Sequence, residues 1–207
     1  MAFWTKWNAP RNRETWKLLA EKIGGELIEG DTWKEERVIL NYRNSIFILD
    51  TVLKGHKHKY FENRIKCSFV SINKFTLKIF LENAFTHAGK IFGIKDIELN
   101  NSKFDDEFYI KSNDKEKAIS FLNSLDLQNL YFAATKNLDL MVSIEIKNNE
   151  SFFSFDSYPP KSSLIVIRAN SEITEIDRLI NWFNLCKITL DRLIEIGEAK
   201  EINLDNQ

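Results

Sequence analysis

The chain divides into segments of helical hydrophobic period and segments of strict alternation. Near the start, Trp16, Leu19, Ala20 and Ile23 recur at three- and four-residue steps, which predicts a helix over residues 11–23. Two glycines follow it directly. Glycine adopts the left-handed backbone conformation that commonly ends a helix, so the helix is expected to stop there.

Alternation of apolar and polar residues then predicts two β-hairpins. The first joins segments 38–42 and 46–52 through a polar turn at 43–45, and the second joins segments 65–69 and 75–81 through a turn at 71–74. Further on, the pattern predicts short helices over 113–122 and 125–134, then strands over 138–146, 152–155 and 164–168. A long helix over 172–196, followed by Gly197, completes the predicted elements.

Strands joined by hairpin turns, with helices between and after them, are typical of the α+β class. The sequence therefore predicts antiparallel sheet built from hairpins, a short N-terminal helix, two short central helices and a long C-terminal helix packed on the sheet. Whether the strands form one sheet or two is left open. No Pro-, Gly- or Ser-rich linker interrupts the chain, so residues 1–207 are expected to be a single domain.

The long C-terminal segment is apolar over much more than one helical stripe, which indicates burial on several sides. Packing on the sheet is the favoured interpretation. The alternative is that part of this helix contacts a second subunit, in a homo-oligomer, or an apolar ligand.

Composition and charge restrict the classes of partner and location that are expected. The chain has 29 basic and 30 acidic side chains and a net charge of −1, so no nucleic-acid partner is expected. No apolar run approaches the roughly 20 residues that a membrane span needs, and no secretory leader follows Met1, which favours a cytoplasmic protein. Cys67 and Cys186 both lie in apolar patterns and are expected to be buried, reduced thiols.

One string stands out from the general pattern. Residues 93–98 read GIKDIE and residues 104–114 read FDDEFYIKSND, with Lys117 three residues further on. This string resembles a signature in a family of uncharacterised bacterial proteins of about 200 residues, and the resemblance extends over nearly the whole chain. The resemblance implies no catalytic or binding residue, because no activity is attached to that family.

Candidate binding residues are few. Asp105, Asp106 and Glu107 form the densest acidic cluster, although a turn leading into a strand explains them more simply. Trp4 and Trp7 near the start could contact a partner, or pack on the core.

Metal chemistry and cofactors are not expected. Glu145-x-Lys147 matches half of a metal-dependent nuclease signature, but no aspartate lies suitably on an adjacent predicted strand. His56 and His58 lack an obvious third ligand. The leading functional hypothesis is therefore a non-catalytic module that binds a protein partner or a small apolar ligand. The alternative is an enzyme with a hidden site, such as a metal-dependent nuclease or hydrolase.

Overall fold

A computed structural model of the protein describes residues 13–30, 36–55, 60–81, 97–136, 142–148 and 162–200. The described strands form one nine-stranded sheet in which every paired strand is antiparallel. They are β1 (Glu26–Ile28), β2 (Arg37–Tyr42), β3 (Ser45–Lys54), β4 (Tyr60–Ser71), β5 (Leu77–Leu81), β6 (Phe108–Ser112), β7 (Val142–Asn148), β8 (Ser163–Ala169) and β9 (Ala199–Lys200). The described helices are α1 (Arg13–Ile23), α3 (Ser102–Asp105), α4 (Lys115–Leu122), α5 (Leu125–Thr135) and α6 (Ile176–Glu195). The predicted α+β class is confirmed.

The order of strands in the sheet differs from their order in the sequence after β4. The order is β1-β2-β3-β4-β8-β7-β5-β6, and β9 pairs with the end of β4. The first predicted hairpin is confirmed, because β2 and β3 pair through a two-residue turn at Arg43 and Asn44, both with positive φ. The second is wrong: β4 and β5 do not pair, because β8 and β7 lie between them. Alternation assigns each side chain to a face of the sheet but does not choose the partner strand.

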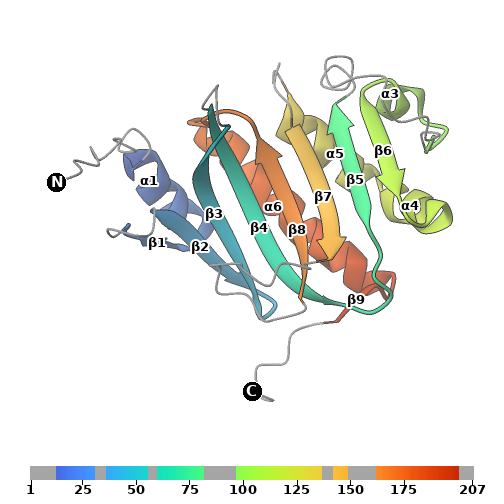
Figure 1. The fold of residues 1–207 in the computed structure, drawn as a ribbon, viewed down its shortest axis with the longest axis horizontal. Coiled ribbons are helices and arrows are strands. Elements are labelled where there is room, and N and C mark those ends of the chain that lie inside the picture. The colour runs from blue at the N-terminus through green and yellow to red at the C-terminus, as the bar shows by residue number, and fades with distance from the viewer. Residues whose placement is uncertain are drawn as a thin grey trace.

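Helices cover one face of the sheet. Figure 1 shows α1, α5 and α6 behind the strands, with α6 running behind β4, β8 and β7. The side chains that point toward these helices form the main apolar core, for example Ile65 and Cys67 on β4, Ile144 and Ile146 on β7, and Leu77 and Ile79 on β5. No described helix covers the opposite face, which is called the helix-free face below. It carries a smaller apolar cluster of Ile48, Leu164 and Val166 beside its charged residues.

Local signals place most helix ends. Gly24 has a φ of +70° directly after α1, as expected for a helix-ending glycine. The Asp114 side chain accepts the Lys117 backbone N–H and so caps α4, which confirms the predicted cap. The long C-terminal helix begins at Ile176, later than the pattern indicated, because Glu175 still has extended backbone.

The long helix α6 is a core helix. It packs against α5, α1 and the sheet, and Trp182, Phe183 and Leu185 are fully buried. This is the packing that its broad apolar surface predicted. The alternative, a homo-oligomer through α6, stays a prediction, and none of the strongly exposed large apolar residues lies on this helix.

The two cysteines are buried and form no disulfide, as predicted. Burial raises the pKa of both thiols, so neither is a reactive thiolate in the folded protein. None of the described helices is both long and apolar enough to span a membrane.

Candidate functional site

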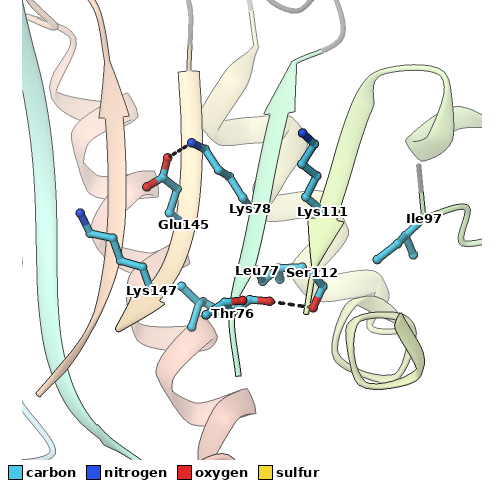
Figure 2. Close-up of a pocket in the computed structure, with 9 residues that line it drawn as sticks. Thr76, Leu77, Lys78, Ile97, Lys111, Ser112, Glu145 and Lys147 are labelled. Atoms are coloured by element: carbon cyan, nitrogen blue, oxygen red, sulfur yellow. Dashed lines mark hydrogen bonds and ion pairs between the residues drawn. The ribbon is translucent and has the colours of Figure 1, made fainter. Parts of the chain in front are cut away.

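A hollow of about 310 Å³ lies where β5, β6 and β7 meet on the sheet. It exists because the three strands are staggered: β5 begins at Leu77, which pairs with Ile146, so Lys147 extends beyond the start of β5. Figure 2 shows Lys78 and Lys111 beside this gap, whereas the Lys147 side chain reaches toward β8. Three lysines and one glutamate line it, together with Thr76, Leu77, Ile97, Ser112 and Ile146; the charged residues are Lys78, Lys111, Glu145 and Lys147.

Glu145 is held between two cations. Its carboxylate pairs with the Lys78 ammonium at 2.8 Å across β5 and β7, and with the Arg168 guanidinium from β8 on the other side. Burial raises the pKa of Glu145, but the hydrogen bond from Lys78 and the charge of Arg168 outweigh it and hold the pKa below its ordinary value. Both carboxylate oxygens are therefore occupied within the protein.

Lys147 is not neutralised in the same way. Its direct neighbour on β8 is Leu164, and no ion-pair or hydrogen-bond partner is found for its ammonium among the described residues. Figure 2 shows the Glu145 carboxylate joined to Lys78, with no link to Lys147. Burial lowers the pKa of Lys147, the nearby charge of Arg168 lowers it further, and the attraction of Glu145 does not compensate.

A second hollow of about 260 Å³ lies on the other side of the Lys78–Glu145 pair. Two aromatic residues, Tyr60 and Phe80, line it with Arg168 and Ser143. Arg168 donates to the Ser143 hydroxyl at 3.0 Å while it pairs with Glu145, so its guanidinium is fixed in place. The acids in this hollow, Glu62 and Glu145, balance its two cations. The first hollow is thus the more positively charged of the two.

A separate ion-pair cluster occupies the helix-free face on β3 and β4. Asp50 accepts two hydrogen bonds from Arg64, at 2.5 and 2.9 Å, and pairs with Lys66 at 3.0 Å. Since this carboxylate already serves two cations, it does not supply the missing counter-charge for Lys147.

The predicted acidic cluster has a mainly structural role. Asp105 ends the short helix α3, and its carboxylate accepts the backbone N–H groups of Leu99 and Asn101 at 2.9 and 3.0 Å. Asp106 and Glu107 are exposed and form the turn into β6. None of the three acids lines either hollow. Their role as binding residues stays a prediction.

The rest of the sequence signature also contributes to packing. Phe104, Phe108 and Ile110 are buried in the core, as their pattern predicted. Lys117 pairs at 2.7 Å with Glu198, a carboxylate that is only 2% exposed, and thereby ties α4 to the segment between α6 and β9. The other two candidates, Trp4 and Trp7, lie outside the described residues.

The geometry lends no support to the nuclease alternative. The two strands beside Glu145 present Lys78 and Arg168 to it instead of the required aspartate. Among the described residues, no group of three or more histidine, cysteine, aspartate or glutamate side chains converges as a metal site. His56 and His58 lie outside the described residues. Hydrolase activity stays an untested alternative.

Sequence reasoning missed Lys78, Lys111 and Arg168 as site residues. Alternation within each strand placed Lys78 and Lys147 opposite the apolar face, and this signal could have identified them as surface cations. It could not have placed them together, because that requires β7 to lie between β5 and β8.

Comparison with known proteins adds no relative: no family model, no curated protein and no solved structure matches the chain.

Replacement of Glu145 tests the ion-pair arrangement through pH. We expect Glu145→Gln to lower the free energy of unfolding at pH 7 by about 1–3 kcal/mol, because two buried charge-assisted bonds are lost. A carboxylate whose pKa is depressed by folding stabilises above its unfolded pKa, and this contribution disappears as pH falls through the folded pKa. The difference between wild type and variant should therefore shrink as the pH is lowered from 7 to 3 in urea unfolding experiments.

The exposed Glu116 on α4 provides the matched control for this comparison, since Glu116→Gln removes a carboxylate from solvent only. Glu116→Gln should change the free energy of unfolding little at any pH. A Glu145→Gln deficit that stayed constant down to pH 3 would show that the carboxylate charge does not carry the stabilisation.

Proposed function

We propose that the protein is a non-catalytic binding module that takes a small anionic ligand in the hollow between β5, β6 and β7. The observation that carries this proposal is the excess of positive charge in a partly enclosed space. Three lysines line the hollow against one glutamate; that glutamate is paired with Lys78 and Arg168, and Lys147 has no ion-pair partner among the described residues. Partly buried charge without a counter-ion is unfavourable, and an anionic ligand would relieve it.

Two features favour binding over catalysis. The titratable groups of the hollow are lysines and a glutamate already held in ion pairs, and Ser112, its one serine, donates its hydroxyl to the Thr76 carbonyl. No general base is within reach of a nucleophile in that set. The hollow is also near the lower size limit of small-molecule sites, which suits a compact ligand.

The charge of the hollow changes the expected ligand. A purely apolar molecule would leave Lys147 without the counter-charge that an anion supplies, so an anion fits better than the apolar ligand that the sequence suggested. No observation among the described residues favours a protein partner on the wider helix-free face. We place the protein in the cytoplasm, where the free thiols Cys67 and Cys186 would stay reduced. We likewise propose that it belongs to the uncharacterised bacterial family, on the strings at residues 93–98 and 104–114 and on Lys117.

Thermal unfolding with matched probes tests the proposal. We expect benzoate, phenyl phosphate or inorganic phosphate to raise the melting temperature, because a ligand that binds only the folded state stabilises it. Benzamide has the ring of benzoate without its charge and should have no effect at the same concentration. Added sodium chloride should weaken the stabilisation by screening.

Backbone amide NMR signals then locate the binding. Titration with the active probe should move the signals of Lys78, Lys111 and Lys147 before those of α4 or α6. Failure of every anion to raise the melting temperature would reject the proposal, as would shifts confined to another part of the protein.

A further inference from the structure

Glu62 is a buried acid without a partner in the part of the chain that the structure describes. It lines the second hollow, yet the residue is only 5% exposed. No hydrogen bond or ion pair reaches its carboxylate from any described residue. Acidic side chains are seldom buried without a partner, because removing a charge from water is unfavourable. A cationic group that enters this hollow would supply the missing partner.

The residues around this hollow belong to the helix-free face. Ile65 of β4, Ile167 of β8 and Ile144 of β7 point into the core beneath the helices, as does Ile79 of β5. Residues an odd number of positions away on each strand therefore point to the opposite face. These four strands lie side by side in the sheet (Figure 1). The lining residues used below are Tyr60 and Glu62 on β4, Arg168 on β8, Glu145 on β7, and Lys78 and Phe80 on β5.

Two arginines lie close to Glu62 in the register of the sheet, and neither pairs with it. Arg64 and Arg168 lie opposite each other on β4 and β8. Glu62 is therefore the diagonal neighbour of Arg168, with about 7–8 Å between such positions. The Arg168 guanidinium instead points to β7, where it donates to the Ser143 hydroxyl at 3.0 Å and pairs with Glu145. Arg64 belongs to the ion-pair cluster on β3 and β4 described above.

The other side of the hollow has the opposite imbalance of charge. Glu145 is shared by two cations, since it pairs with Lys78 at 2.8 Å and with Arg168. One carboxylate for two cations leaves an excess positive charge there. The Nη1 atom of Arg168 makes no hydrogen bond to any described residue, so it can still donate to a ligand. The hollow thus presents a negative group on β4 and a positive group between β8 and β5.

We propose that this second hollow binds a small α-amino acid as its zwitterion, with the ammonium on Glu62 and the carboxylate on Arg168 and Lys78. The site is separate from the anion site of the proposed function and does not depend on it. An α-amino acid carries both charged groups on one carbon atom, which suits an acid and a guanidinium on adjacent strands that do not pair with each other. A simple amine would place a third cation beside the two already present.

The aromatic lining favours an amino acid with an apolar side chain. Tyr60 lies two positions before Glu62 on the same face of β4 and lines the hollow. An ammonium group bound to Glu62 would lie near this ring, where cation–π attraction adds to the ion pair. Phe80 lines the hollow from β5, with the Lys78 ammonium 4.6 Å from its ring centroid. A volume of about 260 Å³ limits the ligand to a single amino acid.

Three molecules with the same phenyl ring separate the charges of the ligand. L-Phenylalanine carries the ammonium and the carboxylate, phenethylamine carries only the ammonium, and 3-phenylpropionate carries only the carboxylate. We expect phenylalanine to raise the melting temperature of the wild-type protein, because it binds the folded state. Each of the other two should bind this site at least about tenfold more weakly, because each lacks one ion pair.

Backbone amide NMR signals assign binding to one hollow or the other. Glu62 and Asn170 line the second hollow alone, and Lys111 lines the first alone. Phenylalanine should move the signals of Glu62 and Asn170 first. This distinction is needed because 3-phenylpropionate is also an anion, which the first hollow is proposed to bind.

Glu62→Gln keeps the size of the side chain and removes its charge. We expect this variant to bind phenylalanine at least about tenfold more weakly than wild type. Without ligand it should melt no lower than wild type, because it removes a buried charge that lacks a partner. Glu116→Gln is the matched control, since Glu116 is exposed on α4 and the change in net charge is the same. It should leave phenylalanine binding as in wild type.

Four results would overturn the proposal. Equal phenylalanine affinity in wild type and Glu62→Gln would reject Glu62 as the partner of the ammonium. A Glu62→Gln protein that melts below wild type would show that the carboxylate is already stabilised in the free protein. Phenethylamine that binds as tightly as phenylalanine would reject the zwitterion. Failure of both phenylalanine and leucine to bind would reject the site, and this result leaves the anion site, with its own probes, unaffected.

Discussion

Replacing Trp182 with alanine is expected to lower the free energy of unfolding by about 3–5 kcal/mol, the usual cost of removing a large buried aromatic side chain. Trp182 lies on α6, is fully buried, and its indole N–H donates to the Ala134 carbonyl at the end of α5, at 3.0 Å. The substitution would leave a cavity between the two helices and an unsatisfied carbonyl. Urea unfolding followed by far-ultraviolet circular dichroism measures the loss.

Trp182→Phe separates the two contributions. It keeps most of the apolar volume and removes the hydrogen bond, so it should cost clearly less than Trp182→Ala. This variant also keeps the comparison possible if the alanine protein does not fold. A cost below about 1 kcal/mol for Trp182→Ala would contradict the packing of α5 on α6.

Phe108→Ala is expected to be comparably severe, at about 3–5 kcal/mol. Phe108 is 2% exposed and begins β6, where its ring lies 4.5 Å from that of Phe104 and 5.4 Å from that of Phe132. Removing it takes one ring out of an aromatic cluster that joins β6 to α3 and α5. Chemical denaturation of the single variant, compared with wild type, gives the value.

Asp106→Ala is the suitable control, because Asp106 is exposed in the turn between α3 and β6. It should cost less than about 1 kcal/mol. Asp105, which follows Phe104 directly in the sequence, is unsuitable as a control because its carboxylate accepts two backbone hydrogen bonds. If Phe108→Ala unfolded like wild type, the structural account of residues 104–114 would be wrong and the acids beside it would become the first candidates for binding.

Those hydrogen bonds also correct an expectation from the sequence. If Asp105 were a simple turn residue, Asp105→Ala would lower the free energy of unfolding only slightly. The structure shows its carboxylate fixing the Leu99–Asn101 segment, so Asp105→Ala should be more costly than Asp106→Ala. The sequence could not reveal these hydrogen bonds, because their donors are backbone N–H groups, which every residue except proline carries.

The candidate site shows the same division between local and tertiary information. Lys147 could be assigned to the polar face of its strand from the alternation of Ile144 and Ile146. That Lys147 finds no ion-pair partner among the described residues could not be predicted, because it depends on Lys78 and Arg168 both reaching Glu145 from strands far apart in the sequence. The hollow itself comes from the stagger between β5 and β7.

The sequence by itself determined the elements and the faces of this protein. Periodicity marked α1, α5 and α6, the Asp114 cap marked α4, and alternation separated the core-facing side chains of each strand from the others. These signals are local, since they follow from the geometry of one helix or one strand. Only the tertiary structure decided which strands pair, because alternation is the same for every possible partner. By placing β8 and β7 between β4 and β5, it brought Glu145 between two cations and left Lys147 beside a hollow, with no ion-pair partner in the part of the chain that the structure describes.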